Sequence, residues 1–200
     1  MTPDIEPRRK GGVLLPTIIV LAVIVIAFVI FTGFYTEFMW FDSVGKTQVF
    51  SIALFTRMGM FAVMFVAMAI VSSLSMWIAF RTRPEFVGAT PEQASLERYR
   101  IGIEPYRRWI ALAIVLILSF FAGLAGSGEY GTYLLWKNST PFNQVDPQFG
   151  LDLSFYTFEL PFMRFVLGFA FTLVILAILI VTAVQYIYGG LRLQPRGDRA

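Results

Sequence analysis

Four long apolar segments alternate with polar ones along this chain. Each segment contains at least 20 consecutive residues without Asp, Glu, Lys or Arg. A helix needs about 20 residues to cross the hydrocarbon core of a bilayer. The pattern therefore predicts an all-α integral membrane protein with four transmembrane helices in a single transmembrane domain. The predicted spans cover about residues 13–34, 52–80, 109–127 and 162–188.

The first apolar segment follows a basic cluster, residues 8–10, as it would in a secretory signal peptide. The apolar core of a signal peptide is only about 7–15 residues long and ends at a small-x-small cleavage site. Residues 13–34 form a longer run of bulky and β-branched side chains without such a site. We therefore interpret this segment as a retained transmembrane helix.

The outer ends of the first two spans carry polar and aromatic residues. Aromatic side chains at 35–41 are typical of the headgroup region, and residues 42–45 are predicted to form a turn. Arg57 is predicted to lie near the outer end of the second span, where its long side chain reaches the interface. An ion pair between Arg57 and Glu37 is the alternative.

Residues 81–108 form the most charged segment. Thr90, Pro91 and Gln93 have the spacing of a helix cap, and Leu96 and Tyr99 lie on one face of the helix that would follow. We predict a short amphipathic helix on the membrane surface, ending near residue 105. A solvated connector is the alternative interpretation.

The distribution of Lys and Arg predicts the orientation. Twelve of these residues lie in segments 1–10, 81–108 and 192–200, whereas the loops on the opposite side, 35–49 and 129–161, contain only Lys46 and Lys137. Positive charge accumulates on the cytoplasmic side of membrane proteins. Both termini are therefore predicted to be cytoplasmic in a cell membrane, with membrane lipid as the surrounding partner.

Composition excludes several kinds of chemistry. The chain is 57% hydrophobic and 14% charged, and it contains no Cys and no His. This chain therefore cannot supply a thiol nucleophile, a disulfide, a Cys or His haem ligand, or an imidazole for acid–base chemistry. The net charge of +3 is explained by membrane topology, so we predict no nucleic-acid partner. We also predict no catalytic residues, no metal site and no cofactor.

The second outer loop, residues 129–161, is predicted to be ordered. Tyr130, Tyr133 and Trp136 could hold a short helix at the membrane surface. Turns are predicted at residues 146–147 and 149–150, and Asp152 is placed to cap the next helix. Clustered oxygen ligands also suit calcium, so a cation site formed by Asp146, Asp152 and Glu159 is an alternative to these turn and cap roles.

Five phenylalanines follow Asp152 at spacings of three and four residues, which places their rings on one stripe of a helix. They are Phe155, Phe158, Phe162, Phe165 and Phe169. The stripe crosses Pro161, so we predict a helix from about Leu153 that enters the membrane with a proline kink. Such a stripe indicates packing rather than a ligand site.

Residues 146–162 contain the string DPxFGxDxxFYxFxLPF. This string resembles a bacterial family of multi-pass membrane proteins, uncharacterised protein family 0182, with further similarity at residues 40–45 and 189–191. The resemblance covers essentially the whole chain. It implies about seven spans followed by a large extracytoplasmic domain, so this chain would be the amino-terminal part of a longer protein. It implies no activity and no catalytic residues.

Three functions remain open, and the leading hypothesis is a structural or assembly role as an anchor for a larger envelope protein. It rests on the absence of Asp, Glu, Lys and Arg from the middle of all four predicted spans, because transport sites usually need such residues. A transporter or channel domain is the alternative, and a polytopic membrane enzyme is third. Possible partners are further transmembrane helices of its own longer chain, or envelope proteins.

Overall fold

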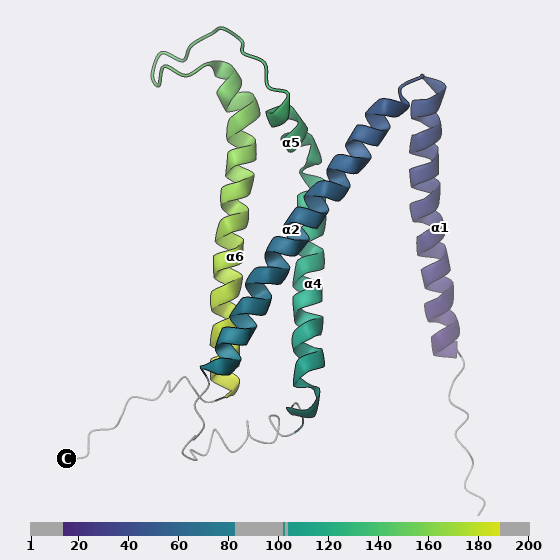
Figure 1. Cartoon of the computed structure of the whole chain (residues 1–200). Helices are drawn as coiled ribbons and strands as arrows, with labels where there is room; N and C mark the ends of the chain where they lie inside the picture. Colours follow the sequence, from purple (N-terminus) through teal and green to yellow (C-terminus); the bar gives the residue numbers. More distant parts are fainter. Residues whose placement is uncertain (1–13, 83–101, 103, 189–200) are drawn as a thin grey trace, which may run out of the picture. The chain divides into compact units, whose positions relative to one another are not determined.

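The computed structural model describes residues 14–82, 102 and 104–188, and in that part of the chain the protein is helical (Figure 1). The helices are α1 (Leu14–Ser43), α2 (Thr47–Arg81), η1 (Glu104–Tyr106), α4 (Arg107–Gly128), α5 (Tyr130–Lys137), η2 (Phe155–Glu159) and α6 (Leu160–Ile187). Strand-like pairing in this part is limited to one isolated bridge, between Val145 and Asp152. The predicted all-α class is confirmed for the described residues.

Four helical segments are long and apolar enough to cross a membrane. They are Leu14–Ser43, Thr47–Arg81, Glu104–Gly128 and Phe155–Ile187, and each overlaps one predicted span. α1 continues nine residues beyond the predicted end at 34, because no Gly or Pro interrupts the aromatic border before Gly45. The predicted surface helix beginning at residue 90 lies outside the described residues.

The chain divides into two units, Met1–Ile52 and Ala53–Ala200, and the division falls inside α2. In unit 1, Phe50 at the start of α2 is buried against the end of α1. Its ring centroid lies 5.4 Å from that of Phe34 and 5.6 Å from that of Phe38. The predicted turn is present, since the Gly45 N–H donates to the Asp42 carbonyl at 2.9 Å and Gly45 has a φ of +64°.

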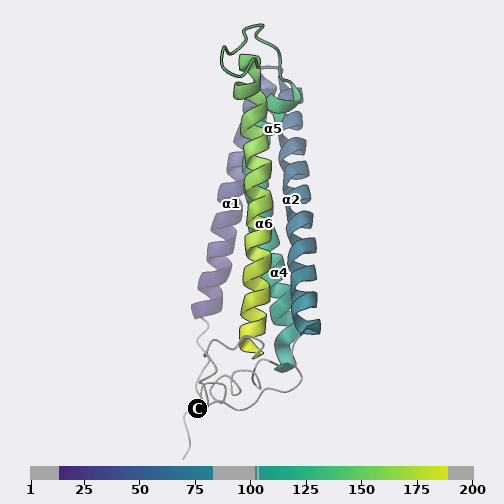
Figure 2. The same ribbon diagram turned by 90° about the vertical axis from the view of Figure 1, so that its left-hand side faces the viewer.

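In unit 2, α2 crosses α4 at small residues (Figure 1), and the end of α2 lies beside α6 (Figures 1 and 2). A Cβ atom added to Gly123 would lie 2.7 Å from the Phe61 ring, and one added to Gly126 would clash with the Met64 side chain. The buried residues of α4 are Val115, Ser119, Ala122, Gly123 and Gly126. Gly123 and Gly126 therefore let the two helices approach closely, because a Cβ atom at either position would meet a side chain of α2.

The core of unit 2 lies at the end where α2 finishes and α4 begins. Its buried cluster joins α2 to α6 and consists of Met76, Ala79, Ile180, Val184 and Tyr188. Polar contacts close the same end: the Gln185 amide donates to the Thr82 hydroxyl at 2.8 Å. We call this end of unit 2 the basic end, because Arg81, Arg107 and Arg108 lie there, and the opposite end, with α5 and residues 138–154, the loop end.

The predicted helix through Pro161 is present and contains a π turn. Helical geometry begins at Leu153, and η2 is a π-helix in which the Leu160 N–H bonds to the carbonyl of Phe155. A proline ring clashes with the carbonyl four residues earlier in a regular α-helix, and the wider turn relieves that clash. The rings of the predicted stripe are all half-buried: Phe155, Phe158, Phe162, Phe165 and Phe169.

The crossing of α2 and α4 generates a stability prediction. Gly126→Leu should destabilise unit 2 by about 1–3 kcal/mol, because its side chain has no room against α2. Gly33→Leu is the matched control, since Gly33 is also inside a long helix but a Cβ there meets nothing within 4 Å. Thermal unfolding of both variants in detergent measures the difference. Equal stability of the two variants would contradict the packing role of Gly126.

Candidate functional site

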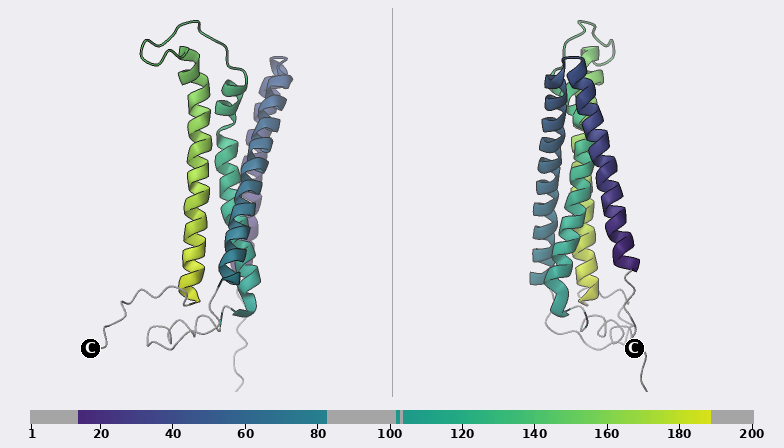
Figure 3. Two further views of the ribbon diagram at one scale, coloured as in Figure 1. Left: turned by 60° about the vertical axis from the view of Figure 1, so that its left-hand side comes forward. Right: turned by 90° about the vertical axis from the view of Figure 1, so that its right-hand side faces the viewer.

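Residues 142–154 fold into a compact loop at the loop end, which extends beyond the ends of α5 and α6 (Figure 3). The bridge between Val145 and Asp152 is flanked by two backbone hydrogen bonds, from Asp146 N–H to the Leu151 carbonyl and from Leu153 N–H to the Gln144 carbonyl, at 2.8 and 2.9 Å. The loop therefore holds its shape through its own backbone pairing.

The tip of this loop is a tight turn. The Gly150 N–H donates to the Asp146 carbonyl at 2.9 Å, and Gly150 has a φ of +67°, a conformation that favours glycine. The turn predicted at residues 149–150 is thus present.

Asp152 organises the base of the loop. One carboxylate oxygen accepts the N–H groups of Ser154 at 2.8 Å and Phe142 at 3.1 Å, and the other accepts the N–H of Asn143 at 2.8 Å. The bonds from Ser154 are the main reason that the pKa of Asp152 is lowered below its ordinary value of 3.8, and those from Phe142 and Asn143 add to the effect. The predicted cap is confirmed, and the same side chain also fixes the backbone at the start of the loop.

Asp146 links the tip of the loop to the helix that follows. Its carboxylate accepts the Phe149 N–H and the Tyr156 hydroxyl, both at 3.1 Å. The sequence predicted a turn at residues 146–147, and the first contact lies within that turn, whereas the second depends on how η2 folds back against the loop. Asp146 and Asp152 therefore both act on local backbone and side-chain donors.

The alternative cation site is not formed by these residues. Within the described part of the chain, no three Asp, Glu, His or Cys side chains are grouped so that they could hold a metal ion. Asp146 and Asp152 lie in one loop, but backbone N–H groups occupy their oxygens. The arrangement supports the turn and cap roles.

Aromatic side chains attach the loop end to α6. The rings of Trp136 and Phe162 stack with their centroids 4.6 Å apart, and Tyr133 lies edge-on to the same phenylalanine at 5.6 Å. Phe158 in η2 packs against Phe142 of the loop, at 5.4 Å. The predicted short helix is present as α5, and its rings pack mainly on the phenylalanine stripe.

Arg57 has an aromatic partner in unit 2. Its guanidinium lies over the ring of Tyr130, 4.2 Å from the centroid, and the side chain is half-buried. A cation above an aromatic face is stabilised by the ring quadrupole. The sequence placed Arg57 near the outer end of its helix but did not identify Tyr130, and the pairing with Glu37 stays a prediction.

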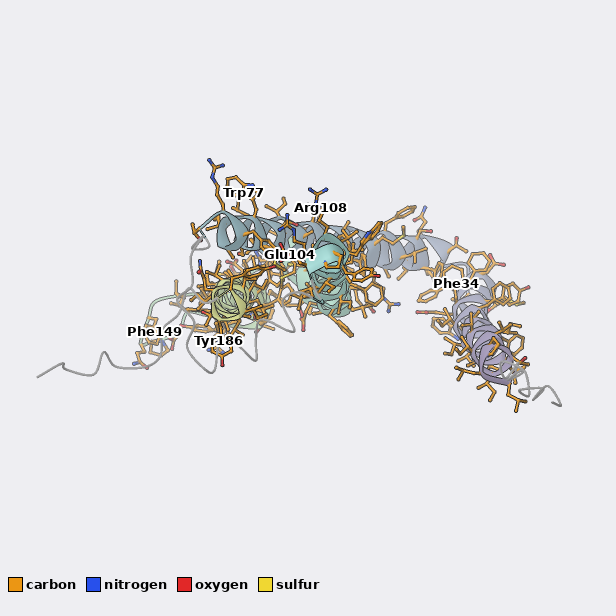
Figure 4. All side chains as sticks on the ribbon, turned by 90° about the horizontal axis from the view of Figure 1, so that it is seen from below. Phe34, Trp77, Glu104, Arg108, Phe149 and Tyr186 are labelled. Carbon is orange, nitrogen blue, oxygen red and sulfur yellow. The ribbon has the colours of Figure 1, made fainter. Side chains whose placement is uncertain are left out.

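A hollow of about 680 Å³ opens between α2 and α4 at the basic end. Its lining combines basic, aromatic and aliphatic residues: Ser73, Met76, Trp77, Phe80, Arg81, Arg107, Arg108, Ala111, Leu112 and Val115. In Figure 4, Trp77 and Arg108 extend to the side of α2 and α4 that lies away from α6. Sequence reasoning used Arg81, Arg107 and Arg108 only to predict the orientation in the membrane, and it did not identify the hollow. The available signal was their position at the end of one predicted span and just before the next.

Glu104 connects two residues at the basic end through hydrogen bonds. Glu104 accepts a hydrogen bond from the Arg107 guanidinium at 2.7 Å and from the Tyr188 hydroxyl at 3.2 Å. The ring of Tyr188 packs against Phe80, with centroids 5.7 Å apart. These contacts join the ends of α2, α4 and α6 beside the hollow.

Comparison with known proteins assigns the chain to a family. Residues 14–199 match the family described as "Uncharacterised protein family (UPF0182)". The chain belongs to this family. The resemblance drawn from residues 146–162 is thereby confirmed.

Individual UPF0182 relatives are similar over almost all of this chain. A UPF0182 protein of Streptomyces coelicolor is 44% identical over 98% of the chain, and one of Salinispora arenicola is 43% identical over 90%. A relative from Frankia casuarinae is 39% identical over 95%. The chain spans about 20% of the length of these relatives. No solved structure matches this UPF0182 chain.

The loop of this UPF0182 chain should depend on the charge of Asp152. Its native pKa is lowered, so the ionised carboxylate stabilises the loop above pH 3.8, and this stabilisation is lost as the pH falls through the lower native value. At neutral pH, Asp152→Ala should expose the Phe142, Asn143 and Ser154 amides to faster hydrogen exchange, measured by mass spectrometry.

Asp42→Ala serves as the control, since the structure gives its side chain no hydrogen bond within the described residues. It should leave exchange in residues 142–154 unchanged. Unchanged exchange in the Asp152 variant would contradict the role of this carboxylate.

Proposed function

We propose that this UPF0182 chain is a multi-pass cell-membrane segment that anchors and positions a larger envelope protein. The observation that supports the proposal most is the absence of ionisable side chains from the central parts of the four long apolar helices. Proton relays and coupled-ion sites usually contain such side chains. The relatives' greater length leaves room for the part that would be anchored.

The loop end supports the same proposal. Its two Asp side chains are engaged by backbone N–H groups, and its aromatic rings pack on α6. Such a loop forms a rigid surface rather than a set of groups available for acid–base chemistry. A polytopic membrane enzyme would need free outer carboxylates, and the hydrogen bonds of Asp146 and Asp152 remove two of the three acidic candidates at this end, so we rank the enzyme third.

A transporter or channel domain is the second candidate. Its helices would be expected to break near the middle of the membrane. The π turn of η2 and Pro161 is a break of that kind, but it lies at the loop end, in the first residues of the segment Phe155–Ile187. We therefore favour the anchor.

The orientation proposed with this function has both termini in the cytoplasm and the loop end outside. Reporter fusions after Lys46 and Lys137 should give external activity, and a fusion after Glu92 should give cytoplasmic activity. The physical reason is the excess of Lys and Arg in segments 1–10, 81–108 and 192–200. External activity of the Glu92 fusion would contradict this orientation.

An anchor and a transporter differ in whether water reaches the middle of the helices. The chain has no Cys, so a single cysteine can be introduced at Ser119, which is fully buried in α4 and whose hydroxyl has no hydrogen-bond partner among the described residues. We expect Ser119→Cys to resist a membrane-impermeant thiol reagent in cells. Mass-shift labelling measures the reaction.

The matched control is Ser139→Cys, at an exposed position of the loop end. This variant should be labelled from outside under the same conditions. Labelling of Ser119→Cys at a comparable rate would indicate a water pathway through the helices, which favours the transporter and contradicts the anchor.

A further inference from the structure

The hollow at the basic end contains positive charge that the described protein groups do not neutralise. Arg107 is paired with Glu104, whereas no carboxylate in the described part of the chain contacts Arg81 or Arg108. Arg81 lies over the Trp77 ring, 5.3 Å from its centroid, and Arg108 is exposed. A guanidinium binds phosphate oxygens through paired N–H groups, so this rim suits a phosphate-containing anion.

The hollow is apolar beneath this charged rim. Leu112 and Val115 of α4 and Met76 of α2 line it, and the same helices continue as segments that are long and apolar enough to cross a membrane. A free phosphate ion would gain nothing from these walls. A molecule with an anionic head and a hydrocarbon tail would contact both parts of the lining.

The position of the hollow also suits a molecule with an anionic head and a hydrocarbon tail. Trp77 and the arginines lie at the ends of two predicted spans, and aromatic and basic side chains at that depth meet lipid headgroups. Trp77 and Arg108 point away from α6, so the packed core of unit 2 does not close the opening (Figure 4). The volume of about 680 Å³ is in the usual range of a small-molecule site.

We propose that the hollow between α2 and α4 binds the headgroup phosphate and the adjoining acyl-chain carbons of an anionic phospholipid. Arg81 and Arg108 would contact the phosphate, Trp77 would lie beside the glycerol region, and Leu112 and Val115 would contact the first carbons of an acyl chain. Basic pockets between transmembrane helices are known to bind anionic headgroups in this way. The inference rests on the membrane location proposed above.

Trp77 provides the readout. The chain has four tryptophans, so a variant with Trp40, Trp109 and Trp136 changed to Phe reports on the hollow alone. This variant is reconstituted into phosphatidylcholine vesicles with brominated phosphatidylglycerol or brominated phosphatidylcholine, which quench fluorescence on contact. We expect brominated phosphatidylglycerol to reach half-maximal quenching at a mole fraction several-fold lower than brominated phosphatidylcholine needs.

Substitution of the rim arginines should remove this preference. The preference is the mole fraction of brominated phosphatidylcholine at half-maximal quenching divided by that of brominated phosphatidylglycerol. Arg81→Gln and Arg108→Gln should each lower this ratio about fivefold, the effect expected for one basic residue near an anionic headgroup. Comparing the two lipids within each variant cancels any change in Trp77 brightness caused by losing the Arg81 contact. Arg81→Lys and Arg108→Lys, which keep the charge, should retain most of the preference.

Arg164→Gln is the matched control, because Arg164 is an exposed arginine near the loop end of α6. It should leave the ratio unchanged. Equal quenching by both lipids in the parent variant, or an equal loss in the Arg164 control, would overturn the proposal. Helical circular dichroism of each variant checks that it is folded.

Two other occupants have distinct signatures, and either would overturn the proposal. If millimolar inorganic phosphate abolishes the phosphatidylglycerol preference, the rim binds a free anion. If a preference arises only after Glu85, Glu92 and Glu97 are changed to Gln, the chain's own acidic residues occupy the rim. Extraction of the protein by alkaline carbonate would instead contradict the membrane location, so the two failures are distinguishable.

Discussion

The close approach of α2 and α4 at Gly123 and Gly126 is the contact on which unit 2 depends. Lipid tails are as apolar as leucine side chains, so helices in a bilayer gain little from hiding apolar surface against one another. Their association depends instead on how closely they pack, and glycine allows the closest packing. Phe61 and Met64 occupy the space that a Cβ atom would take. The crossing of these helices also places the far end of α2 beside α6, where the buried cluster around Ala79 and Val184 forms.

The two ends of unit 2 are held by different interactions. At the loop end, carboxylates bind backbone N–H groups and aromatic rings stack on Phe162, so the chain's own atoms satisfy most of the polar groups. At the basic end, Glu104 braces Arg107 and Tyr188, but Arg81 and Arg108 border an open hollow. A structural role explains the first arrangement fully. The second leaves positive charge beside apolar walls, which is why we place a ligand there.

The motif at residues 146–162 illustrates how a specific sequence can encode a shape rather than a reaction. Asp146, Gly150 and Asp152 each satisfy a geometric requirement of the loop: a turn, a positive φ and a helix cap. Pro161 requires the π turn, and the phenylalanines attach the helix to α5. These requirements explain why so many residues of the motif have a specific identity: each one shapes the loop or attaches it to the helices.

The sequence by itself determined the four apolar helices, the turn at Gly45, the cap at Asp152 and the phenylalanine stripe, because each depends on neighbours a few residues apart. Hydrocarbon requires backbone groups to bond within the same segment, so long apolar runs become helices regardless of their surroundings. Tertiary structure decided the contacts between distant residues: Arg57 with Tyr130, Asp146 with Tyr156, and Arg81 with the start of α4 around one hollow. Those contacts depend on helix crossing and rotation, which the side chains of two helices set together, and no single segment contains that information.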